Sequence, residues 1–162
     1  MIAIRPATVA DAPRCAEIYA PFVNDSWVSF ELDAPDEVEM AGRITRALDS
    51  HDWLVAEADG LVLGYAYGSG HRTRAAYHTS CDVAVYVDPD HNRRGIGRSL
   101  YEALLPRLKA RKMHAAFAGI ALPNEASIAL HRAMGFDPVG VYRQVGWKMG
   151  SWRDVGWFQR LL

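Results

Sequence analysis

Hydrophobic and polar positions along the chain follow two periods, and the alternation between them outlines the secondary structure. A short β-like segment at 2–5 is followed by apolar residues spaced three and four apart up to residue 24, which predicts an amphipathic helix. Thr8 is placed to cap this helix. A β-rich segment at 27–30 predicts a second strand. Asp36 and Glu37 then open a second helix, whose predicted apolar face carries Val38, Ala41, Ile44 or Thr45, and Leu48.

The middle of the chain has the clearest β pattern. Apolar runs at 53–58 and 61–67 flank the turn Asp59-Gly60, which predicts a hairpin. A polar segment then leads into a strand at 80–87. Because side chains alternate along a strand, one set points to one face and the remainder to the other. The first set is Cys81, Val83, Val85 and Val87, and the second is Asp82, Ala84 and Tyr86.

The last third predicts a helix at 96–111 that contains Pro106, a strand at 114–121, a helix at 124–134 and two strands at 139–149 and 152–161. In the helix at 124–134, one stripe is apolar and is expected to face the core. A second, polar stripe (Asn124, Ser127, His131) predicts a solvated or capping face, taken on spacing alone. The apolar stripe consists of Ala126, Ala129, Leu130, Ala133 and Met134. The element order predicts a mixed α/β fold with a largely antiparallel sheet and one β-α-β unit.

Composition narrows the class of protein. The 162 residues fit one domain, 1–162, and 18 basic against 19 acidic residues argue against a general nucleic-acid binder. Apolar runs are too short for a membrane span, and the start of the chain has no leader pattern, so a cytoplasmic location is expected. The two cysteines, Cys15 and Cys81, form no metal or disulfide pattern, so no metal is expected.

The most informative segment is the loop that follows the strand at 80–87. Gly95 and Gly97 open a helix, where free backbone N–H groups and the helix dipole suit a phosphate. Arg93, Arg94 and Arg98 add positive charge. A tight turn with solvated arginines has the same spacing, and the loop lacks the lysine of a Walker A motif and the third glycine of a dinucleotide-binding motif.

Here the chain resembles a known family. The segment from Asn92 to Gly97 is similar to the Gln/Arg-x-x-Gly-x-Gly/Ala motif of the GNAT superfamily of N-acetyltransferases. Further similar stretches at 85–87, 122–124, 135–136 and 150–156 indicate its phosphinothricin and methionine sulfoximine acetyltransferase branch. Asn92 departs from the motif, which usually has Gln or Arg there. The resemblance implies a splayed sheet flanked by helices, the acyl-CoA N-acyltransferase fold.

The resemblance also implies where acetyl-CoA binds. Its pantetheine arm is expected to pair with the backbone of Val85, Tyr86 and Val87, in the gap before the strand at 114–121. Its diphosphate is expected over the amides of residues 93–98, which include Ile96. Asn124 and Ser127 are expected to contact the CoA arm. His131 stands where many relatives have a tyrosine that protonates the leaving thiolate, so it is expected to serve as an acid or to contact the cofactor.

Amine acetylation also needs a base, because a free amine is mostly protonated at neutral pH. Asp82 is the candidate, with a structural carboxylate as the alternative. Relatives place Glu there, and the shorter Asp favours proton transfer through water. Cys81, on the opposite face, is expected to be inert, which argues against a covalent acetyl-cysteine.

The acceptor is expected to be a small glutamate-like amino acid. Arg72 and Arg74 are two apart on an extended segment, where they form either a carboxylate-binding pair or ordinary surface charge. Glu31 is expected to receive the substrate ammonium, or to lie on the surface beside a core Phe30. The expected acceptor-site residues are Phe30, Glu31, Arg72, Thr73, Arg74, Tyr77, Asp82, Val83 and Ala84. Relatives imply a homodimer. Another amine acceptor, such as a protein N-terminus, and a non-catalytic acyl-CoA-binding module stay open as alternatives.

Overall fold

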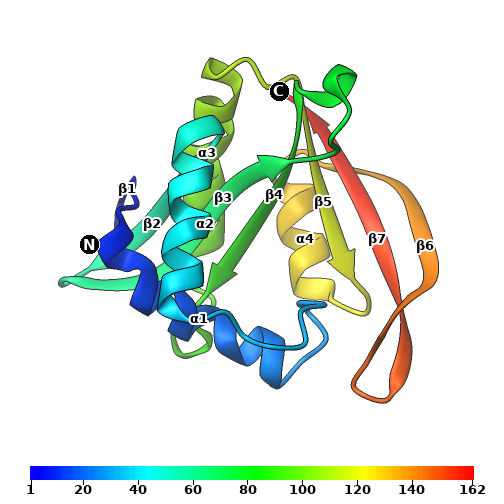
Figure 1. The fold of residues 1–162 in the computed structure, drawn as a ribbon, viewed down its shortest axis with the longest axis horizontal. Helices are drawn as coiled ribbons and strands as arrows, with labels where there is room; N and C mark the ends of the chain where they lie inside the picture. The colour runs from blue at the N-terminus through cyan, green and yellow to red at the C-terminus, as the bar shows by residue number, and fades with distance from the viewer.

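The computed structural model describes residues 1–162, which form seven strands, four α-helices and three short 3-10 turns (Figure 1). The turns are η1 (Val9–Asp11), η2 (Ala75–Tyr77) and η3 (Pro89–His91). The helices are α1 (Ala12–Asn24), α2 (Glu37–Ser50), α3 (Ile96–Ala110) and α4 (Glu125–Ala133). The strands are β1 (Ala3–Pro6), β2 (Asp52–Ala58), β3 (Leu61–Gly70), β4 (Ser80–Val87), β5 (Ala115–Ala121), β6 (Asp137–Lys148) and β7 (Ser151–Leu161).

All seven strands join one sheet in the order β1-β2-β3-β4-β5-β7-β6. Every neighbouring pair is antiparallel except β4 and β5, which run parallel. That parallel pairing covers only the starts of the two strands and ends where Asp82 is beside Phe117. Beyond this point β4 and β5 diverge, as Figure 1 shows. The expected mixed, largely antiparallel and splayed sheet is confirmed.

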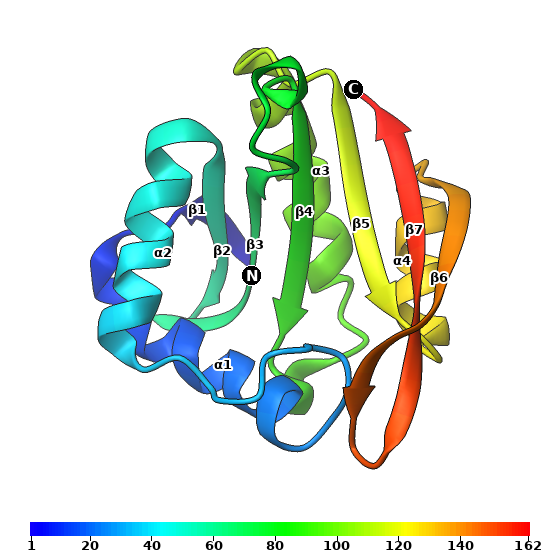
Figure 2. The same ribbon diagram turned by 45° about the vertical axis from the view of Figure 1, so that its right-hand side comes forward.

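Helices cover both faces of the sheet, α1 and α2 on one and α3 and α4 on the other (Figure 2). The alternation of side chains along β2 separates the two cores. Trp53 and Val55 pack with α1 and α2, whereas Leu54 and Ala56 pack with α3. The hairpin turn has φ of +51° at Asp59 and +76° at Gly60. Positive φ at both residues suits the twist of the flanking strands, as the Asp-Gly pair predicted.

The strand predicted at 27–30 is wrong, because this segment is an irregular loop. Its backbone bonds to side chains and to α1 instead of to a neighbouring strand. Val28 N–H donates to Ser26 Oγ, and Ser29 N–H donates to the Phe22 carbonyl. Serine hydroxyls therefore offer this backbone a local alternative to the sheet. The loop between α1 and α2 crosses the face of the sheet that these two helices cover, close to the end of β4 (Figure 2).

The helix faces were also predicted incorrectly in part. In α2 the buried side chains are Met40, Ile44 and Ala47, whereas Val38 is 75% exposed. Asp36 caps this helix by accepting the N–H of Glu39, which puts Val38 in the exposed first turn.

In α4 the predicted core positions Ala126, Ala129 and Ala133 are exposed, and the predicted solvated residue His131 is 4% exposed. Ile128 packs against the core instead. Alanines have little surface to bury, so the larger side chains decide which face of the helix turns inward. No helix of the chain is both long and apolar enough to cross a membrane.

Candidate active site

The loop from β4 to α3 holds its backbone in a shape suited to an anion. Asp88 accepts the N–H of Asp90 and pairs with Arg14 of α1, which anchors the start of the loop. Arg93 and Gly95 have φ of +65° and +71°, and α3 begins directly afterwards at Ile96. Successive amides in such a turn, together with a helix N-terminus, form a concave binding site for phosphate oxygens.

A cavity of about 570 Å³ lies beside this loop, between the end of β4, the start of α3, and α4. Asn124 caps α4 by accepting the N–H of Ser127, 3.1 Å away. A Cβ at Gly97 would lie 3.2 Å from Leu130 Cδ2, so this glycine allows α3 and α4 to approach closely. All the predicted cofactor residues except Arg94 line this cavity: Val85, Tyr86, Val87, Arg93, Gly95, Ile96, Gly97, Arg98, Asn124 and Ser127.

The cavity continues into a narrow groove of about 60 Å³ between the diverging strands β4 and β5. The two spaces share Val28, Val85, Tyr86, Asn124 and Ser127. The groove is mostly apolar, and its polar side chains come from α3 and α4. Its walls include the segments 83–86 and 118–121.

His131 and Tyr101 are the buried polar pair of this groove. His131 Nδ1 lies 2.7 Å from the carbonyl oxygen of Ser127, so Nδ1 carries the proton. Nε2 is 2.9 Å from the Tyr101 hydroxyl and accepts from it. Burial lowers the pKa of His131, which keeps the ring neutral. In this arrangement His131 Nε2 accepts the Tyr101 hydroxyl and has no proton of its own to donate to a thiolate.

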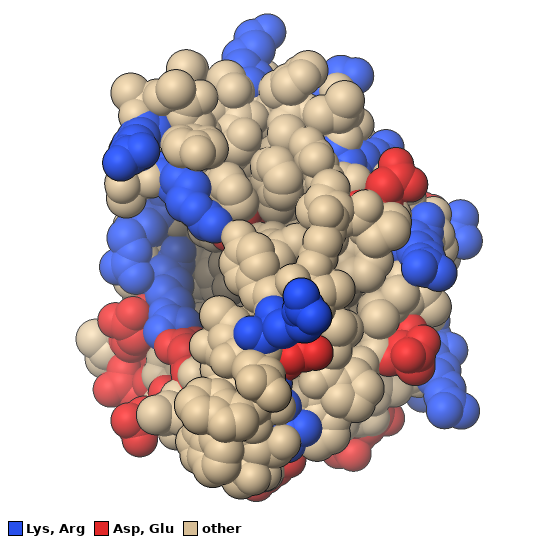
Figure 3. Space-filling view, turned by 90° about the vertical axis from the view of Figure 1, so that its right-hand side faces the viewer, with Lys and Arg blue, Asp and Glu red and all other residues tan.

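At the end away from the anion-binding loop, the groove between β4 and β5 joins a cavity of about 600 Å³, which we call the acceptor cavity. The two share Val28, Val83, Ala84, Tyr86, Gly119 and Ala121. The space-filling view shows a hollow on this side of the molecule with Lys and Arg side chains along one edge (Figure 3). The lining also includes polar or aromatic side chains from five parts of the chain: Tyr19, Glu31, Tyr67, Asp82 and Trp157.

Comparison with known proteins identifies the family. A family model described as "Acetyltransferase (GNAT) family" matches residues 13–136. The chain belongs to the GNAT acetyltransferase family. It is 38% identical to the phosphinothricin N-acetyltransferase of Streptomyces viridochromogenes, covering 98% of this chain and 87% of that protein. It is 37% identical to the L-methionine sulfoximine/L-methionine sulfone acetyltransferase of Pseudomonas aeruginosa, over 96% of this chain and 92% of the other.

The same family relation holds for solved structures. The phosphinothricin acetyltransferase of Sinorhizobium meliloti, solved in complex with acetyl-CoA, superimposes with a TM-score of 0.95 at 35% identity. The match covers 99% of this chain and 88% of that one. The expected resemblance to the phosphinothricin and methionine sulfoximine branch is therefore confirmed. The GNAT chain has no group of three His, Cys, Asp or Glu side chains able to hold a metal ion.

Asp82 of this GNAT chain points into the acceptor cavity, opposite to the buried Cys81, as the alternation along β4 predicted. Its side chain is 32% exposed. Burial raises the pKa of Asp82 above its usual value, and a hydrogen bond from His71 opposes this rise. Burial also raises the pKa of Cys81 to about 12, which fits the inert role expected of that thiol.

The basic segment before β4 is placed beside the acceptor cavity, not in its lining. The Arg72 guanidinium lies 6.0 Å from the Trp157 ring and borders a neighbouring cavity of about 240 Å³. Trp157 lines both spaces, so Arg72 is one side chain away from the acceptor cavity. Thr73 and Arg74 are exposed, and Tyr77 is 43% exposed. The structure thus does not bring Arg72 and Arg74 together on one ligand position.

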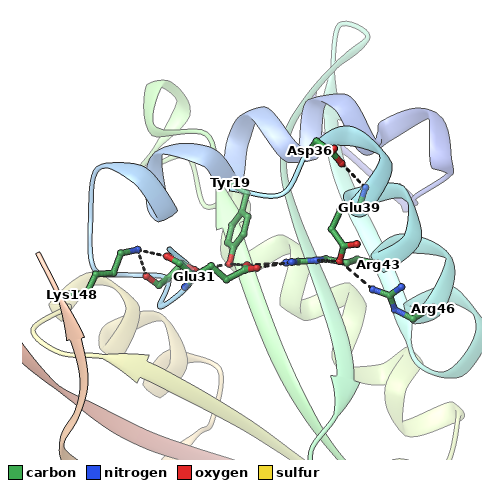
Figure 4. Close-up of polar contacts among 8 residues, drawn as sticks. Tyr19, Glu31, Asp36, Glu39, Arg43, Arg46 and Lys148 are labelled. Carbon is green, nitrogen blue, oxygen red and sulfur yellow. Dashed lines mark hydrogen bonds and ion pairs between the residues drawn. The ribbon is translucent and has the colours of Figure 1, made fainter. Parts of the chain in front are cut away.

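Phe30 and Glu31 do line the acceptor cavity, but the Glu31 carboxylate is already engaged (Figure 4). Arg43 of α2 binds both of its oxygens, at 2.6 and 2.9 Å, and Tyr19 donates its hydroxyl to Oε2. The hydrogen bonds from Arg43 lower the pKa of Glu31. From the opposite side Lys148 reaches the same loop (Figure 4).

Lys148 is a buried cation that holds the 25–36 loop from the β6–β7 hairpin. Its Nζ donates to the carbonyls of Val23, Ser29 and Glu31 at 2.6, 2.6 and 2.7 Å, and the residue is only 6% exposed. Sequence reasoning missed it, along with Arg43, Tyr101 and His71. None of these four stands in a motif. A lysine between apolar residues at the end of the strand predicted at 139–149 was the one available signal.

Proposed function

We propose that this GNAT enzyme transfers acetyl from acetyl-CoA to the α-amine of a small glutamate-like amino acid. The observation that carries the proposal is one continuous path through the sheet. It runs from the anion-binding loop, through the groove between β4 and β5, to the acceptor cavity that holds Asp82. Relatives named for phosphinothricin, methionine sulfoximine and methionine sulfone support that choice of acceptor.

The cofactor side follows from the unpaired edge of β4. Pairing with β5 ends at Asp82, so this edge from Val83 to Val87 is free to bond the amides of a pantetheine arm. The diphosphate then lies at the amides of residues 93–98, with Arg93 and Arg98 alongside. The thioester is thereby placed in the groove, close to the point where the strands meet.

The reaction is a direct transfer. The neutral amine attacks the thioester carbonyl carbon, the C–S bond breaks, and CoA leaves as a thiolate. The attacking nitrogen loses a second proton as the amide forms, which balances the proton that the thiolate takes up. The ammonium proton goes to Asp82, directly or through a water molecule, before the attack. Holding the amine and the thioester in one path contributes a large part of the rate by itself. His131 and Tyr101 lie beside the expected position of the sulfur. Because His131 Nε2 accepts a hydrogen bond from Tyr101, we assign His131 to contact with the cofactor and not to direct protonation of the thiolate.

The acceptor's charge fits the rim of the cavity. Arg72, beside Trp157 of the cavity wall, supplies positive charge, which favours an acidic substrate over a polycation; Arg74 follows it on the same segment. Glu31 receives the substrate ammonium only in competition with Arg43, so we assign to it the shaping of the cavity wall. We also propose that the chain is one domain, acts in the cytoplasm and forms a homodimer. The exposed aromatic pair Trp147 and Trp152 on the β6–β7 hairpin supports the dimer.

The test is CoA-thiol release measured with acetyl-CoA and a panel of acceptors. The panel contains phosphinothricin, methionine sulfoximine, methionine sulfone, glutamate, a polyamine and an alanine-ended peptide. We expect release with the first three and little with the polyamine. Asp82→Asn is expected to lower turnover by roughly 10²-fold or more while leaving acetyl-CoA binding nearly unchanged. Tight acetyl-CoA binding without release for any acceptor would support a non-catalytic binding module instead.

A further inference from the structure

The carboxylate of Asp82 has one polar partner within the chain. His71 Nδ1 lies 2.6 Å from Asp82 Oδ1, and Oδ2 accepts no hydrogen bond from the protein. The two residues come from neighbouring strands. Ser69 of β3 is in register with Asp82 of β4, and His71 follows immediately after β3 ends at Gly70. The chain therefore turns back at this point and places the imidazole against the carboxylate.

Aromatic packing fixes the His71 ring in this orientation. Its ring stacks on Phe117 with centroids 4.3 Å apart and an interplanar angle of 17°. Trp157 meets it edge-on at 6.0 Å. Phe117 is the β5 residue paired with Asp82, so the stacking partner and the hydrogen-bond partner are neighbours in the sheet. The His71 side chain is only 12% exposed, which leaves it little freedom to swing away.

We propose that His71 is a positioning residue for the acetyl transfer, whose Nδ1–H holds Asp82 Oδ1 and so presents an ionised Oδ2 to the acceptor amine. The inference rests on the proposed role of Asp82 as the base. A base must be deprotonated when the ammonium arrives, yet burial favours the neutral acid at this position. A donor on Oδ1 stabilises the carboxylate against that burial. It also leaves one oxygen, with a fixed direction, to receive the proton.

The surroundings of the pair contain few other groups that would titrate in the same range. Arg72 is the one nearby fixed charge, and it also favours the ionised carboxylate. Strands β5 and β7 present only Phe117 and Trp157 to the pair. The other titratable side chains near the pair are the Cys81 thiol, whose pKa burial raises, and three phenols. The phenols are Tyr67 of β3, Tyr77 of η2 and Tyr142 of β6.

The experiment compares the pH profile of kcat/KM for wild type and two variants. His71→Phe keeps an aromatic ring on Phe117 but removes the donor, and His71→Asn keeps a donor near the position of Nδ1. Loss of the donor lets the pKa of Asp82 rise, so the acidic limb of the His71→Phe profile should move up by about one pH unit. The His71→Asn limb should stay near that of wild type. His78→Phe, on the same loop, is the matched control and should leave the profile unchanged.

A second measurement does not depend on how the His71 variants fold. In the wild-type protein the ¹⁵N chemical shifts of the His71 ring report which nitrogen carries the proton, and we expect a protonated Nδ1 facing Asp82 Oδ1. An acidic limb of the His71→Phe profile that stays at its wild-type position, or a His71 ring whose Nδ1 carries no proton in the wild-type protein, would overturn the proposal. Unchanged turnover in Asp82→Asn would instead overturn the proposed base, so the two failures are distinguishable.

Discussion

Gly146 on β6 shows how the sheet shapes the acceptor cavity, and Gly146→Ala tests it. A Cβ at this position would overlap Cε2 of Phe30 and lie 2.8 Å from its Cζ, where ordinary contacts begin near 3.4 Å. The Phe30 ring, which lines the acceptor cavity, must therefore move by roughly 1 Å or turn outward. Such overpacking costs about 1–3 kcal/mol. The lower backbone entropy of alanine offsets this by stabilising the strand by about 0.5–1 kcal/mol.

The net loss of up to about 2.5 kcal/mol should lower the unfolding temperature by as much as roughly 5–10 °C. Because Phe30 lines the acceptor cavity and not the cofactor cavity, the KM of the acceptor should rise about fivefold, which corresponds to about 1 kcal/mol of lost contact. The KM of acetyl-CoA should stay the same. Initial rates of thiol release with each substrate varied in turn measure both constants, and thermal unfolding measures the stability.

Gly140→Ala is the matched control, because a Cβ at this other β6 glycine meets nothing within 4 Å. We expect it to leave both KM values unchanged and the unfolding temperature equal or slightly higher. A Gly146→Ala protein as stable as the Gly140→Ala protein, with a wild-type KM for the acceptor, would show that Phe30 does not rest on β6 as described.

Three further predictions concern the 25–36 loop and the cofactor loop. Lys148→Met removes a charged donor from three carbonyls, so it should lower the free energy of unfolding by about 3 kcal/mol and raise the KM of the acceptor. Urea unfolding measures the first effect, and initial rates at varied acceptor concentration measure the second. The Arg43 bonds lower the pKa of Glu31, so its contribution to stability is present above the pKa of an unfolded glutamate and is lost as pH falls through the folded value. In urea unfolding, the difference in free energy of unfolding between wild type and Glu31→Gln should thus be largest near pH 7. It should shrink progressively as the pH falls below about 4. Arg93→Ala should raise the KM of acetyl-CoA about tenfold, less so at high salt, and leave that of the acceptor unchanged; equal effects on both would contradict its role.

Local rules were enough to predict the parts of the site that depend on consecutive residues. The alternation along 80–87 put Asp82 and Cys81 on opposite faces, and the sheet has them there. The glycine spacing at 95–97 predicted a helix start with free amides, and α3 begins at Ile96. In both cases neighbouring residues in the sequence determine the geometry, so a single sequence contains the information.

The remaining parts depend on contacts between distant segments, which no local pattern encodes. The pairing of His71 with Asp82 needs the β3–β4 register and the stacking surface of Phe117. The loop at 27–30 has strand-forming residues, but Lys148, more than 110 positions away, takes its carbonyls. Local propensity is a weak guide when a distant charged donor and nearby hydroxyls satisfy the backbone outside a sheet.

The position of Asp82 explains how the proposed base can lie between the expected sites of the thioester and the acceptor. It is the last β4 residue paired with β5, so it lies at the vertex from which the two strands diverge. On one side of that vertex the free edge of β4 leads to the anion-binding loop, and on the other side the acceptor cavity opens. A ligand that bonds along the free edge must therefore end near Asp82. The splay of the sheet thus sets the distance between the cofactor loop and Asp82, and α3 and α4 pack on one face of the splayed sheet (Figure 2).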